Sequence, residues 1–180
     1  MKKQLFILLF MCTGLATNAQ LYITKTGFAG FYSKTPLEDI KAENNQVVAM
    51  IDTEKKQIAF SMLLKSFTFR KELMQEHFNE NYVESDKYPR AVFKGSFTGT
   101  VDLQKQQVYN IQVEGTITLH GVDKKISVPA TIEMSNGVLS GVAKFQLAPQ
   151  DFNIKIPSLV SDKIAKLIDV EIKVECNPKK

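Results

Sequence analysis

The chain has 180 residues, of which 44% are hydrophobic and 23% are charged, and its 23 basic side chains exceed its 19 acidic ones by a net charge of +4. Such a small excess argues against nucleic-acid binding, because proteins that neutralise a phosphate backbone concentrate basic residues in patches. The length suits one domain with a hydrophobic core of its own.

Residues 1–19 have the pattern of an export signal. Lys2 and Lys3 precede an apolar run at residues 5–11 that is too short for a stable membrane span, and small residues at 17–19 favour cleavage before residue 20. We therefore expect an exported protein, periplasmic or alternatively secreted, whose mature domain comprises residues 20–180 and has no stable membrane span. Cleavage would also remove Cys12, so no internal disulfide is expected.

Most of the mature chain shows the two-residue side-chain period of β-strands. Near the C-terminus, for example, Ile168, Val170 and Ile172 alternate with Asp169 and Glu171. The strands predicted in this way are residues 20–34, 46–51, 57–69, 91–103, 107–120, 124–134, 138–147 and 151–156, with a last strand from residue 168.

Turn and helix signals separate these strands. The dipeptide Asn136-Gly137 lies between two alternating runs and predicts a tight β-hairpin. Apolar residues fall at helical spacing within residues 71–80, which predicts a short helix followed by an irregular loop up to Arg90. A second short helix is predicted over residues 158–166.

Many antiparallel strands that share one apolar side close most readily into a barrel or a two-sheet sandwich. We expect an all-β fold, an antiparallel eight-stranded barrel with one or two short helices. The residues assigned to its interior are Phe60, Met62, Phe93, Phe97, Ile111, Val113, Ile117, Val128, Ile132, Phe145, Phe152 and Ile154. A barrel of this size is either filled by its own side chains or leaves room for one ligand, and the apolar pattern by itself allows both.

The sequence offers little for catalysis. His77 and His120 have no partner at metal-site spacing, and no serine lies in a nucleophile-elbow motif. Cys176 lies in an apolar stripe and is expected to be a buried small hydrophobe. We therefore expect no enzyme, no metal site and no cofactor.

Six segments carry motifs that are informative together, at residues 31–36, 66–69, 74–82, 88–95, 113–122 and 151–154. In their order and spacing the chain resembles the YceI-like family of exported polyisoprenoid-binding proteins, over nearly the whole mature length. The resemblance implies a lipocalin-like antiparallel barrel whose apolar lumen holds a long isoprenoid chain, such as a polyprenyl lipid or a quinone tail.

The leading hypothesis is therefore non-enzymatic binding of an isoprenoid or other long-chain lipid in the barrel lumen, for transport, storage or sequestration in the cell envelope. Candidate ligand-binding residues are Phe60, Met62, Phe93, Phe97, Ile117, Phe145 and Phe152 on the wall, and Phe67, Phe69, Met74 and Phe78 at the entrance. The alternative is a dry, packed barrel that serves as an envelope partner-binding or structural module. An enzyme acting on an isoprenoid would need a polar constellation in the lumen that the sequence lacks. The sequence leaves open whether the chain forms a homodimer.

Overall fold

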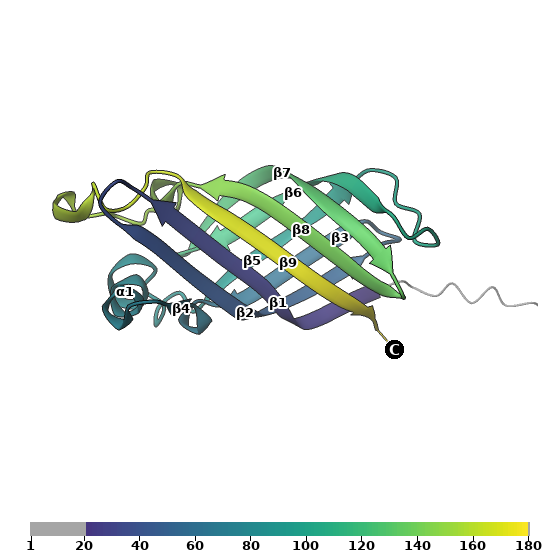
Figure 1. The fold of residues 1–180 in the computed structure, drawn as a ribbon, viewed down its shortest axis with the longest axis horizontal. Helices are drawn as coiled ribbons and strands as arrows, with labels where there is room; N and C mark the ends of the chain where they lie inside the picture. The colour runs from purple at the N-terminus through teal and green to yellow at the C-terminus, as the bar shows by residue number, and fades with distance from the viewer. Residues whose placement is uncertain (1–20, 180) are drawn as a thin grey trace, which may run out of the picture.

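The structure is a computed structural model that describes residues 21–179, so the export signal predicted for residues 1–19 lies outside the described residues. Eight long antiparallel strands form a closed barrel (Figure 1). Around the barrel the order is β1, β9, β8, β7, β6, β5, β3 and β2, and pairing of β1 with β2 closes the circle. The strands are β1 (Leu21–Lys34), β2 (Asp39–Asp52), β3 (Gln57–Leu63), β5 (Arg90–Thr98), β6 (Val108–Leu119), β7 (Val122–Ser135), β8 (Val138–Leu147) and β9 (Ile168–Pro178). The predicted fold class is confirmed.

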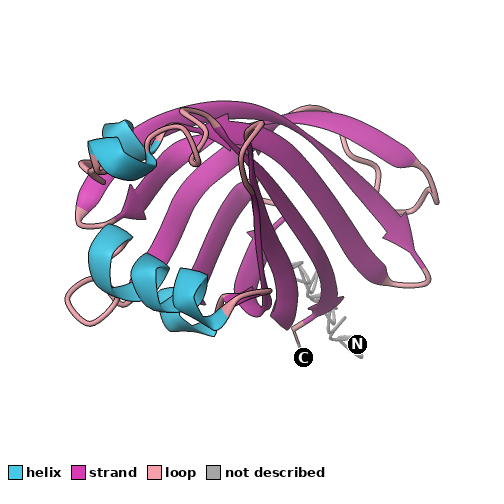
Figure 2. Ribbon diagram, turned by 60° about the vertical axis from the view of Figure 1, so that its left-hand side comes forward, coloured by secondary structure: helices cyan, strands magenta, loops and turns pink. Residues whose placement is uncertain are grey.

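Short helical segments gather at one end of the barrel, on two sides of that end (Figure 2). On one side, the segment between β3 and β5 contains the two-residue strand β4 (Thr68–Phe69), helix α1 (Glu72–His77) and the π-helix η2 (Phe78–Tyr82), after the 3₁₀-helix η1 (Leu64–Ser66). On the other side, the segment between β8 and β9 contains the 3₁₀-helices η3 (Pro149–Phe152) and η4 (Ser158–Val160). We refer to residues 70–90 as the insert.

Two predicted elements between β8 and β9 were wrong. Residues 151–156 do not form a strand, because Pro149 has no N–H for a sheet and starts a 3₁₀-helix, and Asn153 adopts a left-handed conformation with φ of 56°. Residues 158–166 are helical only in η4. A helix this short gains stability chiefly by packing an apolar face, and Leu159 is 91% exposed.

Strand β2 is longer than predicted. It begins at Asp39 instead of residue 46, and the sequence pattern did not reveal this part of the strand because it buries a polar residue, Asn44. Asn44 is fully buried, yet its amide donates to the carbonyl of Leu63 at 2.9 Å and its side-chain oxygen accepts from the backbone N–H of Gln46 at 2.8 Å. A buried polar group is tolerated when its hydrogen bonds are made, so the strand continues past a residue that the apolar period excludes.

The core consists of two apolar clusters, one toward each end of the barrel. The cluster at the end away from the helices contains Phe97, Ile111, Leu139 and Cys176, and Val101 and Leu103 of the β5–β6 loop pack against it. That end is therefore filled by side chains. The second cluster lies toward the helical end and includes Phe67 and Phe152. All the residues assigned to the interior from the sequence lie in or against these clusters.

At the level of the first cluster, between Phe93 and Phe97, two interior glycines face each other across β5 and β6. A Cβ on Gly115 would lie 2.4 Å from the carbonyl oxygen of Lys94, and a Cβ on either Gly95 or Gly115 would lie 2.7 Å from Cζ of Phe93. No side chain fits there, and the Phe93 ring lies along this bare backbone. The ring therefore occupies the space that a side chain on either glycine would need.

Cys176 confirms the expectation of a buried small hydrophobe, and it supplies a pH prediction. Burial raises the pKa of its thiol from an ordinary 9.0 to about 11. The folded pKa therefore exceeds that of the unfolded chain, so the thiol's contribution to stability is complete below pH 9 and is lost as the pH rises through 11. We expect the free energy of unfolding to fall more steeply over this range in the wild type than in Cys176→Ala, as measured by urea denaturation. Equal falls in the two proteins would contradict the burial of the thiol.

Candidate functional site

At the helical end the interior opens as a cavity of about 290 Å³, and we call this opening the mouth. Strands β1, β2, β3, β5, β6, β8 and β9 form the cavity wall, and the β1–β2 turn, the segment between β3 and β5 and the segment between β8 and β9 contribute the rest of the lining. The lining is almost entirely apolar. It includes eight of the sequence-predicted site residues, namely Met62, Phe67, Phe69, Met74, Phe78, Ile117, Phe145 and Phe152.

A second cavity of about 90 Å³ continues deeper into the barrel, and we call it the deep chamber. It is lined by two further predicted residues, Phe60 and Phe93. The two cavities share the lining residues Met62, Ala91, Ile117, Phe145 and Ile172. The two cavities therefore adjoin at this level of the barrel, and both are lined by apolar side chains.

Phe97 lines neither cavity. Phe97 is 2% exposed and belongs to the first cluster, some of whose other members line the deep chamber. The two-residue period placed Phe97 on the interior face, but it carries no information on depth along the barrel.

Phe31 on β1 lines the cavity near the mouth and was missed as a candidate, although it lies in one of the family-like segments. Its ring contacts those of Phe67, Phe69 and Phe78, with centroid distances of 5.4, 5.7 and 5.4 Å. Such aromatic contacts add to the stability that burial provides. These four rings attach the insert to the barrel wall.

The β8–β9 segment supplies a group of lining residues that sequence reasoning also missed. Ile156, Val160 and Ile164 line the cavity although they lie outside any strand. Their spacing of four residues was a usable signal, but it is typical of a helix face, whereas the segment contains only the short 3₁₀-helix η4 followed by turns.

Comparison with known proteins relates this architecture to a family. The family model described as YceI-like domain matches residues 24–176. The chain belongs to the YceI-like family. A comparison of this YceI-like protein with curated proteins gives no match.

Solved structures share the fold of this YceI-like protein. One similar structure is a polyisoprenoid binding domain from Saccharophagus degradans implicated in plant cell wall breakdown, with a TM-score of 0.76, 15% identity, and coverage of 89% of this chain and 99% of that one. Burkholderia cenocepacia BcnA gives a TM-score of 0.70 at 13% identity, covering 83% of this chain and 95% of its own. A Campylobacter jejuni YCEI protein gives 0.64 at 18% identity, with coverage of 77% and 85%. Because the sequence identities to these three structures are low, the similarity establishes a shared fold and no more.

His120 of the YceI-like barrel joins the insert to η3. Its Nε2 lies 2.7 Å from a carboxylate oxygen of Glu84, and its Nδ1 lies 2.9 Å from the carbonyl oxygen of Phe152. The ring also packs edge-on against Tyr88, with centroids 4.7 Å apart. With both nitrogens and one face engaged in this way, His120 holds the two sides of the mouth region together.

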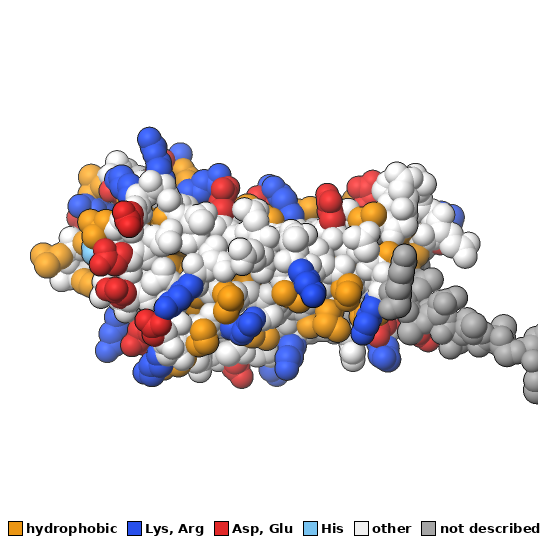
Figure 3. Space-filling model, turned by 90° about the horizontal axis from the view of Figure 1, so that it is seen from below, with side chains coloured by type: hydrophobic (Ala, Val, Ile, Leu, Met, Phe, Trp, Pro, Cys, Tyr) orange, Lys and Arg blue, Asp and Glu red, His pale blue; other side chains and the backbone are white. Residues whose placement is uncertain are grey.

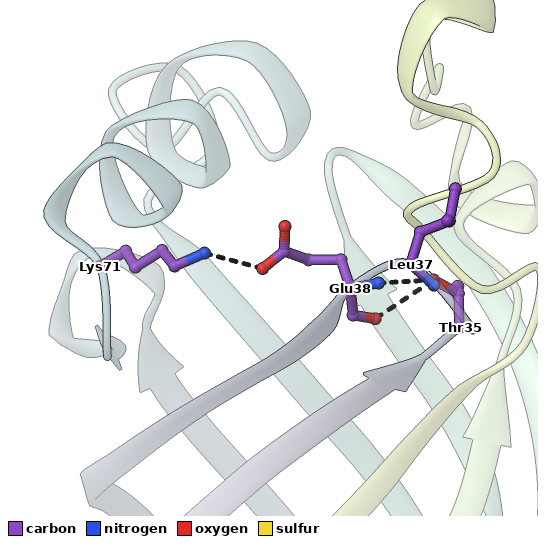
Figure 4. Close-up of polar contacts among 4 residues, drawn as sticks. All are labelled: Thr35, Leu37, Glu38 and Lys71. Carbon is purple, nitrogen blue, oxygen red and sulfur yellow. Dashed lines mark hydrogen bonds and ion pairs between the residues drawn. The ribbon is translucent and has the colours of Figure 1, made fainter.

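The charged groups of the mouth lie at its edge. The ammonium of Lys71 donates to the Glu38 carboxylate at 2.8 Å and joins the start of α1 to the β1–β2 turn (Figure 4). Within that turn, the Thr35 hydroxyl accepts from the backbone N–H of Glu38 at 3.1 Å and of Leu37 at 3.3 Å. The hydrogen bond and the charge of Lys71 lower the pKa of Glu38, and the charge of Lys163 acts in the same direction. The pair is therefore intact at neutral pH and is lost as acid protonates Glu38.

Lys71→Met tests whether this ion pair holds α1 against the barrel. Exposed ion pairs contribute little to global stability, so we expect the free energy of unfolding to stay close to that of the wild type. Amide hydrogen exchange over residues 72–82 should nevertheless become faster. Lys41→Met is the matched control, because Lys41 forms its ion pair with Glu43 on its own strand and does not contact the insert. Equal exchange in the two variants would show that the pair does not restrain the insert.

The described residues hold no group of three or more His, Cys, Asp or Glu side chains placed to bind a metal ion. Over residues 21–179 no helix has the length and apolar character required to cross a bilayer.

Proposed function

We propose that this YceI-like protein binds an isoprenoid or similar long-chain lipid in the barrel lumen without catalysing a reaction. The observation that carries the proposal is the apolar cavity that opens at the mouth, with the apolar deep chamber next to it. A cavity of about 290 Å³ is close to the lower limit of roughly 300 Å³ for small-molecule sites. The description of the Saccharophagus degradans neighbour as a polyisoprenoid binding domain supports the same class of ligand.

The driving force would be removal of the hydrocarbon tail from water. Each buried methylene contributes roughly 0.8 kcal/mol, so affinity should increase with tail length until the lumen is full. The polar end of the ligand would remain at the mouth, where Glu38, Lys71 and Lys163 lie. The lining of the deep chamber contains no ionisable side chain among the described residues, which favours binding over catalysis.

The cell envelope is the proposed location, and the support for it is the signal-like sequence of residues 1–19. Fractionation of producing cells, with N-terminal sequencing of the product, tests this part. A mature chain starting at residue 20 outside the cytoplasm is expected, and an uncleaved cytoplasmic chain would contradict it.

Native mass spectrometry of the purified mature protein tests ligand binding directly. We expect a bound species of higher mass that organic extraction removes and that reappears when the delipidated protein is mixed with a polyprenol. A protein that never carries extra mass, before or after exposure to polyprenol, would instead favour the dry barrel as a partner-binding module.

A further inference from the structure

Three leucines project into solvent beside the mouth. Leu37 lies in the β1–β2 turn, Leu159 in η4 and Leu167 just before β9, and they are 62%, 91% and 53% exposed. Figure 4 shows Leu37 extending from its turn, and Figure 3 shows hydrophobic side chains projecting at this end, on the left. Exposed residues of this size, gathered at one place on a folded domain, mark an interaction surface.

These leucines belong to two segments that lie together. The hydroxyl of Ser33, at the end of β1, accepts a hydrogen bond of 2.8 Å from the backbone N–H of Ala165. The first residues of β9 also pair with the last residues of β1, with Asp169 opposite Tyr32. We define the tip as residues 34–39 together with residues 155–167. The tip forms one side of the mouth.

The exposed charges of the tip are mainly positive. Its exposed lysines outnumber its exposed acids, with Lys34, Lys155, Lys163 and Lys166 against Asp39 and Asp162. The remaining acid, Glu38, is paired with Lys71. The insert differs in its balance of charge, because the exposed bases around Leu73 are matched in number by exposed acids, with Arg70, Lys71, Lys87 and Arg90 against Glu72, Glu76, Glu80 and Asp86. Exposed apolar side chains therefore coincide with an excess of exposed basic charge on the tip and not on the insert.

We infer that the tip docks on the surface of a bilayer that contains anionic phospholipid. Leucines that enter the headgroup region lose contact with water, while the long lysine side chains reach the lipid phosphates. The positive charge of the tip is complementary to an anionic membrane surface. For this reason we infer that the binding partner of the tip is a membrane. Docking would also bring the mouth to the bilayer, so that a water-insoluble ligand could move between bilayer and lumen without crossing water. This last consequence rests on the proposed function.

Sedimentation with lipid vesicles tests the inference. The mature protein should bind vesicles of phosphatidylglycerol and phosphatidylethanolamine more tightly than vesicles of phosphatidylcholine, and salt should weaken the binding. Leu159→Ser should lower the partition coefficient roughly tenfold. Lys163→Gln and Lys166→Gln should each lower it roughly fivefold. Val108→Ser is the matched control, because Val108 is 58% exposed at the start of β6, beside the loop that packs on the filled end.

Ligand binding and docking are measured separately, so their failures can be distinguished. Native mass spectrometry of each variant records the lipid in the lumen, and we expect Leu159→Ser to retain it. Vesicle binding by a protein that never carries lipid would support docking and would contradict the proposed function. Absence of vesicle binding, as expected if the tip contacts a protein, would overturn the inference. Equal binding to neutral and anionic vesicles, or equal losses in Leu159→Ser and Val108→Ser, would also overturn it.

Discussion

Phe97→Ala is expected to lower the free energy of unfolding by about 3–5 kcal/mol. The Phe97 ring is 2% exposed, lies in the packed cluster and lines neither cavity, so its removal creates a void where none exists. Paired strands surround it, with Val113 opposite it on β6, and they limit how far the site can collapse. Urea denaturation of the mature protein at neutral pH measures the loss.

Phe145→Ala is the variant with which Phe97→Ala should be compared, because it removes the same ring from a cavity wall. Phe145 is half-buried and lines both cavities, so its ring already faces open space. We expect a smaller loss of stability than for Phe97→Ala and a larger loss of affinity for a polyprenol. If the two substitutions cost the same stability and neither changes lipid binding, the lumen is packed and the dry-barrel alternative is correct.

The barrel could be predicted from the sequence because the side-chain period of a strand reports directly which face is buried. Phe60, Ile117 and Ile132 lie inward as their alternation requires. Depth along the barrel could not be predicted in the same way. Phe93 and Phe97 lie on the same face of β5, yet one lines the deep chamber and the other is packed beyond it. Depth depends on strand tilt and on the stagger between strands, which alternation does not encode.

The mouth was less predictable than the barrel, because its lining depends on irregular backbone. Asn153 adopts a left-handed conformation after η3, and this ends the two-residue period that predicted a strand. Phe152 and Ile154 are nevertheless buried in the cluster nearest the mouth. Their apolar character was informative about burial, whereas the local conformation was decided by Pro149 and by packing against the barrel.

Ala91→Phe is expected to shorten the longest hydrocarbon tail that the lumen accepts. Ala91 lies inward on β5 and lines both cavities, so a phenylalanine ring there would occupy the space where the mouth cavity and the deep chamber adjoin. Excluding one five-carbon isoprene unit from the lumen would remove up to about 4 kcal/mol of binding, roughly a thousandfold in affinity. Titration with farnesol, geranylgeraniol and longer prenols measures the effect. In the wild type affinity should rise with each added unit, whereas in the variant the rise should stop earlier.

Ala59→Phe provides the matched control for this prediction. Ala59 alternates with the inward residues Ile58 and Phe60 on β3, and it lies opposite exposed Met50 and Lys94 on the neighbouring strands. The same ring is therefore added outside the wall, and the affinities should follow those of the wild type. The larger side chain of Ala91→Phe can extend into the neighbouring cavity. We therefore expect it to lower the free energy of unfolding by less than the roughly 1–3 kcal/mol that overpacking costs in a filled core. If the two variants bind every prenol equally, the tail does not pass Ala91, and the deep chamber is not part of the binding site.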